Sequence, residues 1–199
     1  MQTSGAEKIS AARSDSLFPQ PACEPHSDFN PITWLGDEHR RQRTACDVLE
    51  LLIRNPRHSA SHGDIEKTYW CLGEALPMHI ADEEEDVLPL LARRCGLSDR
   101  FGEISATLRS NHDKERMMAE SVAGELERLI EGEALSRPVR FFGDTIRLYR
   151  IIRSHIDWEN RILIPLARRR LRDLDYPYLM EKIGQRRRER PPHGSGDLG

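Results

Sequence analysis

Two short stretches of the chain each place a histidine four residues before a glutamate: HIADE at 79–83 and HIDWE at 155–159. In both cases a proline follows at the same distance, at Pro89 and Pro165. Positions i and i+4 lie one turn apart on the same face of an α-helix. An imidazole nitrogen and a carboxylate oxygen can therefore reach one point in space, which is how helices build metal sites. Two copies of the pattern predict a metal site between helices.

The similarity extends beyond these two stretches. An offset of 76 residues aligns 79–94 with 155–170, including the histidine, the glutamate, the proline and a pair of arginines. Two further histidines, His39 and His112, lie 73 residues apart in the segments that precede the two copies. The order is a lone histidine and then a His-x-x-x-Glu pair, twice over. This order predicts two helical hairpins related by a pseudo-twofold axis, with all six side chains meeting in the core.

Four long helical patterns would position these side chains. They are expected to run from Asn30-Pro31 to about residue 55, from Asp64 to Cys95 with Gly96 ending the helix, from Ser98 or Asp99 to Glu131-Gly132, and from Ser136 to about 172. A short fifth helix is expected after Tyr176-Pro177. Each long pattern has an apolar stripe that a histidine interrupts, and two stripes also contain a glutamate. The sequence therefore predicts an all-α protein, an up-down-up-down four-helix bundle with a short C-terminal helix.

Burying these polar groups needs an explanation. Unpaired carboxylates in a core are costly, and the inward stripes carry no lysine or arginine nearby to balance them. Four neutral imidazoles and two carboxylates form a nitrogen and oxygen set with a total charge of −2, which suits two ions bridged by both carboxylates. Such donors favour iron, manganese or zinc, and the spacing does not choose among the three. The alternative, six hydrogen-bonded core residues without metal, requires every buried polar atom to find a partner.

Composition excludes several other classes. The 199 residues hold 30 Lys and Arg against 33 Asp and Glu, a net charge of −3, and the basic clusters lack interleaved aromatic residues, so we expect no nucleic acid partner. No run of about 18 apolar residues exists to cross a membrane. The N-terminal segment has no apolar core of the signal-peptide kind, so a cytoplasmic location is expected. None of the four cysteines forms a Cys-x-x-Cys pair, and Cys46 is expected to act as a small buried hydrophobe.

At this point the arrangement resembles a known family, the hemerythrin-like (HHE cation-binding) domain. The H-x-x-x-E…P stretches at 79–89 and 155–165 are similar to its two signatures, and the resemblance covers roughly residues 30–172. It implies a bundle that holds two non-haem irons. Glu83 and Glu159 would be the bridging carboxylates, and the terminal ligands would be His39, His79, His112 and His155. Residues 1–29 would then form a flexible N-terminal extension, and 173–199 a short helix and a disordered tail.

The chain departs from the oxygen-carrying members of that family. Those carry a second histidine where this chain has Arg116, and an aspartate where it has Asn160. The six-ligand set instead resembles bacterial di-iron proteins linked to repair of iron centres, and the iron-sensing domain of an F-box protein. The resemblance implies a protein that binds, senses or reacts with O2, NO or peroxide under iron, oxidative or nitrosative stress, served by an electron donor or a partner protein. The alternative is a non-catalytic iron sensor or iron-binding module that acts through a partner.

Residues around the six ligands also carry expectations. Glu84, Glu85 and Asp86 are expected to form a solvated face, and the alternative for this run is a hydrogen bond to a ligand histidine. Glu115 lies three residues after His112 on the inward side, so core packing, an outer hydrogen bond or a substitute ligand role are all open. Tyr69 and Tyr149 are expected to pack in the core, and the alternative for both is a hydroxyl group that contacts bound dioxygen. The arginine runs at 168–170 and 186–188 are expected to stabilise helix ends.

Overall fold

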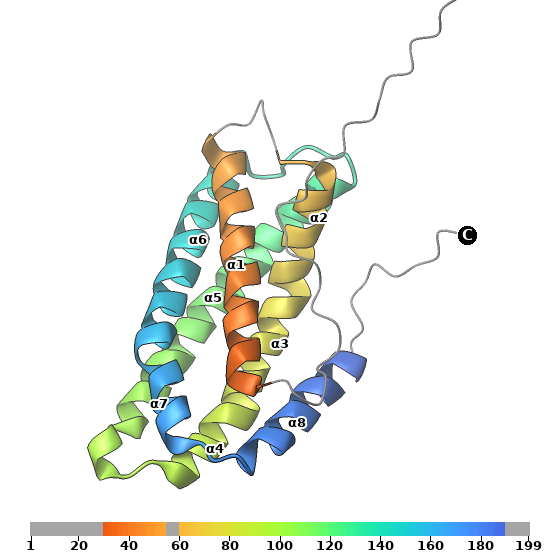
Figure 1. Ribbon diagram of the computed structural model, residues 1–199. Helices are drawn as coiled ribbons and strands as arrows, with labels where there is room; N and C mark the ends of the chain where they lie inside the picture. The colour runs from red at the N-terminus through yellow and green to blue at the C-terminus, as the bar shows by residue number, and fades with distance from the viewer. Residues whose placement is uncertain (1–29, 55–59, 190–199) are drawn as a thin grey trace, which may run out of the picture.

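A computed structural model describes residues 30–54 and 60–189, and within these ranges every regular element is a helix (Figure 1). The expectations for the N-terminal extension, residues 1–29, and for the C-terminal tail from residue 190 fall outside the described residues. The helical elements, in chain order, are α1 (Pro31–Arg54), α2 (His62–Trp70), η1 (Cys71–Ala75), α3 (Leu76–Ala81), η2 (Asp82–Val87), α4 (Leu88–Arg94), η3 (Leu97–Asp99), α5 (Phe101–Ile130), α6 (Pro138–Arg161), α7 (Leu163–Arg170) and α8 (Asp175–Glu189).

The long elements pack side by side as a helical bundle, with α8 across one end (Figure 1). Elements α2 to α4 follow one another without a break, since η1 and η2 are π-helical stretches within one rod. Helix α1 packs against α2 and α6, and α5 packs against α2 and α6, so each rod contacts two others. Within the described residues no helix is long and apolar enough to cross a membrane.

The ends of the helices follow local chemistry. The Asn30 side chain accepts a hydrogen bond from the Ile32 amide at 2.8 Å, which caps α1 as predicted. Helix α2 begins at His62, two residues before the expected start, because Ser61 caps it through the Asp64 amide. Gly132 ends α5 with a φ of 77°, a conformation that favours glycine.

Proline shapes the two rods that carry the His-x-x-x-Glu pairs. Each π-helical stretch lies just before a proline, η1 before Pro77 and η2 before Pro89. In η2 the amide of Leu88 donates to the carbonyl of Glu83, five residues earlier, so the widened turn accommodates a residue that cannot donate. The fourth helix was expected to continue to about residue 172, but it breaks at Ile162, three residues before Pro165. Pro165 cannot donate to the carbonyl of Arg161, which explains the break.

The core consists of two apolar clusters separated by a polar layer. One cluster lies toward the α1–α2 end and includes Leu49, Leu76 and Ile152; the other lies toward α4 and α7 and includes Leu91 and Leu163. On each rod the predicted site residues fall between members of the two clusters. The apolar clusters above and below shield this layer from water, which strengthens every electrostatic interaction within it.

Helix α8 is longer than the short fifth helix expected from the sequence and begins at Asp175, before Tyr176-Pro177. The Asp175 carboxylate accepts from the Arg172 amide at 2.9 Å and from Arg94 at 2.8 Å, which fixes the start of α8 against α4. Its side chains Arg186 and Arg187 reach η2. They do not merely complement a helix end, as the sequence suggested.

A candidate di-metal centre

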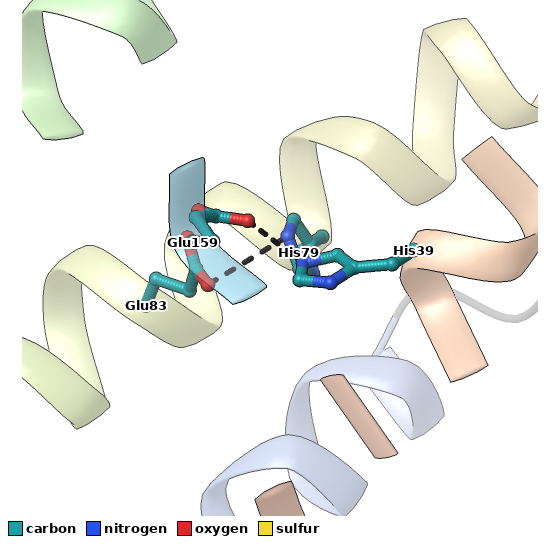
Figure 2. Close-up of side chains that lie close together, drawn as sticks. All are labelled: His39, His79, Glu83 and Glu159. Carbon is teal, nitrogen blue, oxygen red and sulfur yellow. Dashed lines mark ion pairs between the residues drawn. The ribbon is translucent and has the colours of Figure 1, made fainter. Parts of the chain in front are cut away.

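The structure brings all six predicted ligand residues into the polar layer. His39 comes from α1, His79 from α3, Glu83 from η2, and His112 from α5, while His155 and Glu159 come from α6. All six are at most 5% exposed. Figure 2 shows four of them, His39, His79, Glu83 and Glu159, converging from three rods.

Each of the two carboxylates lies between two pairs of histidines, His39 with His79 and His112 with His155. The Glu159 Oε2 atom lies 2.7 Å from His39 Nε2, and its Oε1 atom lies 2.9 Å from His155 Nε2. The Glu83 Oε1 atom lies 3.8 Å from His79 Nε2, and its Oε2 atom lies 3.2 Å from His112 Nε2. Each carboxylate therefore offers one oxygen to the His39–His79 pair and the other to the His112–His155 pair.

Two positions for a cation follow from this geometry. Ligand atoms of His39, His79, Glu83 and Glu159 lie within 4.8 Å of one another, as do those of His112, His155 and Glu159. Within each pair the imidazole rings meet edge to face, with centroids 5.1 Å apart for His39–His79 and 4.9 Å apart for His112–His155. Glu159 belongs to both groups.

The facing atoms are buried and lie close enough to form ion pairs with one another, but their geometry is not that of hydrogen bonds. Both oxygens of Glu83, both oxygens of Glu159 and the Nε2 atoms of His39, His112 and His155 lack a hydrogen-bond partner. Buried polar atoms without partners are rare because each costs free energy. Here they converge on common points, and the donor set of imidazole nitrogens and carboxylate oxygens suits borderline metal ions. The residues present therefore fit a pair of cations.

Two further carboxylates support the histidines from outside. Glu115 of α5 accepts a hydrogen bond from His155 Nδ1 at 2.7 Å, which is one of the three roles left open for this residue. Glu84 of η2 accepts from His112 Nδ1 at 2.6 Å, so the expectation of a solvated face was wrong for Glu84. It was also wrong for Asp86, which is 4% exposed. Such outer partners fix which imidazole nitrogen faces a metal and raise its basicity.

The spacing of an ideal α-helix could not reveal Glu84. Residues 83 and 84 point about 100° apart on such a helix, so a ligand role for Glu83 argues against an inward role for its neighbour. The π-helical geometry of η2 and the arrival of His112 from another rod bring both glutamates to the site. The proline at position 89 is the local signal that this helix is irregular.

The other candidates lie away from the centre. The Tyr69 hydroxyl donates to Glu127 at 3.0 Å, and Tyr149 is buried with the Arg153 guanidinium over its ring. Tyr149 belongs to the apolar cluster at the α1–α2 end and the partly buried Tyr69 packs against it, as expected from core packing. Cys46 is fully buried, which confirms its role as a small hydrophobe.

Burial and mutual charge shift the ionisation of the metal-free site. Burial, followed by the charge of Glu159, raises the pKa of Glu83 to about 8. Burial opposes the protonation of His155, but the carboxylates of Glu115 and Glu159 outweigh it and raise the pKa of His155 to about 11. Burial, then His39, lowers the pKa of His79 well below its usual range. The metal-free centre therefore holds protons that a cation must displace.

These shifts predict opposite pH dependences for folding and for metal binding. Raised pKa values stabilise the fold at low pH. The Glu83 contribution is lost as pH rises from about 4.5 to about 8, and that of His155 as pH rises from about 6.5 to about 11. The opposing contribution of His79 is complete by about pH 7. Between about pH 7 and pH 8.5 the metal-free protein should lose stability in urea unfolding, while its affinity for Zn²⁺ rises. If the stability of the metal-free protein instead rises across this interval, the raised pKa values of Glu83 and His155 would be contradicted.

The fold and this layer define a class, a helical bundle with a buried histidine and carboxylate cluster suited to cations. Comparison with protein families identifies it: residues 30–167 match the Hemerythrin HHE cation binding domain, so the chain belongs to that family. Membership carries with it the binding of cations, iron in the typical case. Comparison with curated proteins and with solved structures gave no match.

Proposed function

We propose that the protein is a non-haem di-iron protein of the six-ligand type that binds, senses or reacts with a small ligand such as O2, NO or peroxide. The bundle is taken as up-down-up-down, with Glu83 and Glu159 bridging the two ions. His39 and His79 complete one position, and His112 and His155 the other. The observation that carries the proposal is the pair of buried carboxylates, each with one unpartnered oxygen toward each pair of histidines.

The chain's own residues prepare this chemistry. A pair of irons would supply the capacity to bind a small ligand and to exchange electrons with it. Six protein ligands leave coordination positions open on two ions, so a small molecule can enter. Glu84 and Glu115 hold the His112 and His155 rings with Nδ1 turned outward and Nε2 turned inward. The apolar clusters on both sides exclude bulk water from the layer.

Turnover separates reaction from binding. If the iron-loaded protein is an enzyme, it should consume peroxide or NO in steady state, and His112→Ala should abolish this consumption. A protein that binds iron stoichiometrically but shows no turnover with O2, NO or peroxide would be a sensor or an iron-binding module instead. Anaerobic stopped-flow mixing of the iron-loaded protein with each ligand measures both properties in one experiment.

The ion pairs that connect α8 to the helix carrying Glu83 favour the sensor alternative. Arg187 donates to both oxygens of Asp82, at 3.0 and 2.5 Å, and Arg186 donates to Asp82 and, at 2.9 Å, to Asp86. Asp82 is fully buried and immediately precedes Glu83. A change in the ligand turn can therefore be passed to α8, where a partner protein could detect it.

The ion pairs between α8 and η2 predict how removal of one arginine changes stability and iron release. Arg187→Leu should lower the free energy of unfolding by about 1–3 kcal/mol, because a buried carboxylate loses charged hydrogen bonds. If α8 reports on the site, iron should also dissociate faster from this variant. Arg188→Leu is the matched control, since Arg188 is exposed on the same helix. Loss of stability with unchanged iron release would remove the argument for signalling through α8.

A further inference from the structure

The internal repeat reveals an asymmetry in the residues that surround the two metal positions. Residues 39 and 112 differ by 73, and by the same offset Gln42 of α1 corresponds to Glu115 of α5. Both are inward and buried, at 4% and 2% exposure. Glu115 accepts a hydrogen bond from His155 Nδ1, whereas His79 Nδ1, on the histidine equivalent to His155, has no hydrogen-bond partner. The repeat thus places a carboxylate on one side and a neutral amide on the other.

A second pair of equivalent residues shows the same difference. Residues 79 and 155 differ by 76, and by that offset Glu84 corresponds to Asn160. Glu84 accepts from His112 Nδ1 at 2.6 Å, whereas His39 has only the neutral amide of Asn160 nearby and no carboxylate at its Nδ1 atom. Glu84 also lies 3.3 Å from Arg116 and 3.6 Å from Arg109, which offset part of its charge. Glu115 is therefore the stronger source of negative charge behind the histidines.

We infer that Glu115 makes the position held by His112 and His155 the tighter of the two, so that this position fills first. The inference rests on the proposed di-metal function and adds an order of binding to it. A carboxylate behind an imidazole fixes its tautomer, increases its electron donation and adds a negative charge near the cation. The His39–His79 position lacks this support. No carboxylate fixes the tautomer of its histidines, so part of the binding free energy must select the tautomer that can bind a metal.

The number of converging ligands does not explain the expected order. Four residues converge on the His39–His79 position and three on the other, so ligand count alone would favour the opposite order. The Glu83 Oε2 atom, 3.2 Å from His112 Nε2, supplies a fourth donor to the second position after a small movement. The outer carboxylates have no such substitute on the other side, because Gln42 is neutral and its buried Nε2 atom lacks a partner. The charge of the outer carboxylates should therefore determine which position binds more tightly, and the number of converging ligands should matter less.

The two positions would then have distinct roles. The ion supported by Glu115 would be retained and would favour the more oxidised state, since electron donation by its histidines stabilises higher positive charge. The ion at the His39–His79 position would exchange more readily with free iron. This division gives an iron-responsive protein a permanent and a variable position within one site. Glu115 acts through His155, so it is a positioning residue.

The test is to load metal-free protein anaerobically with one equivalent of Co²⁺ and to locate the ion by anomalous diffraction, with calorimetric titration of the same samples. The first ion should lie at His112 and His155. Glu115→Gln should weaken the first binding step by about 10- to 100-fold. The double variant Glu115→Gln with Gln42→Glu should move the first ion to His39 and His79. Glu120→Gln, an exposed change on α5, should alter neither step.

The experiment distinguishes failure of the proposed binding order from failure of the di-metal proposal itself. Equal occupancy of both positions at one equivalent, or first filling at His39 and His79 in the unmodified protein, would overturn the order of binding and leave the di-metal proposal in place. Absence of Co²⁺ binding under all conditions would overturn both. If Glu115→Gln does not fold, Gln42→Glu alone still decides, because it should tighten the second binding step and narrow the difference between the two.

Discussion

Glu83→Gln should give a folded protein that retains little metal. In the metal-free protein burial and the charge of Glu159 raise the pKa of Glu83 to about 8, so its side chain is largely a neutral acid at neutral pH. Glutamine has nearly the same shape and no charge, so the metal-free fold should be undisturbed. An amide, however, cannot bridge two cations as a carboxylate does. We expect affinity to fall by more than about 100-fold, the upper end for loss of an outer partner of a metal ligand.

Metal analysis after passage over a chelating column measures this effect, with thermal unfolding of the metal-free proteins as a check on folding. Glu120→Gln is the matched control, because Glu120 is exposed on α5. Iron content that is unchanged in Glu83→Gln would contradict a bridging role. Loss of metal together with loss of the metal-free fold would mean that Glu83 contributes to folding as well, and Glu159→Gln would then repeat the comparison.

Loading with metal should raise the melting temperature strongly. A ligand present at about 1,000 times its Kd stabilises the folded state by about 4 kcal/mol, which corresponds to roughly 8–16 °C for a chain of this size. The gain arises because cations satisfy the unpartnered oxygens of Glu83 and Glu159 and the facing histidine nitrogens. Differential scanning calorimetry with Fe²⁺ under anaerobic conditions measures the shift. The shift should largely disappear in Glu83→Gln; a melting temperature unaffected by Fe²⁺, Mn²⁺ and Zn²⁺ would contradict the cation site.

The six polar residues were predictable because they obey helical periodicity. His39, His79, Glu83, His112, His155 and Glu159 fall on apolar stripes at matched heights, and the structure gathers them into one buried layer. The helical class and most helix ends followed from equally local signals, such as the Asn30 cap and the glycine at 132. Local spacing and capping act through adjacent turns, so a sequence displays them directly.

Features that depend on an irregular helix or on a distant partner were not predictable. The break at Ile162 and the π-helical turn at 82–87 follow from prolines whose effect on a helix varies with its surroundings. The inward role of Glu84 depends on His112 reaching it from another rod. The pairing of Arg187 with Asp82 joins residues 105 positions apart, and nothing in either local sequence specifies the other. The repeat alone shows that Gln42 corresponds to Glu115. Its significance depends on the hydrogen bond between Glu115 and His155, which only the structure shows.

We propose above all that the buried layer holds two irons that are accessible to small ligands. The most direct test is metal analysis of the protein loaded anaerobically with Fe²⁺, combined with absorption spectra before and after exposure to air. We expect two irons per chain and a near-ultraviolet absorption that appears on exposure to air and is absent from Glu83→Gln. A colourless protein that binds zinc but takes up no iron under any condition, or that holds a single ion however it is loaded, would contradict this proposal.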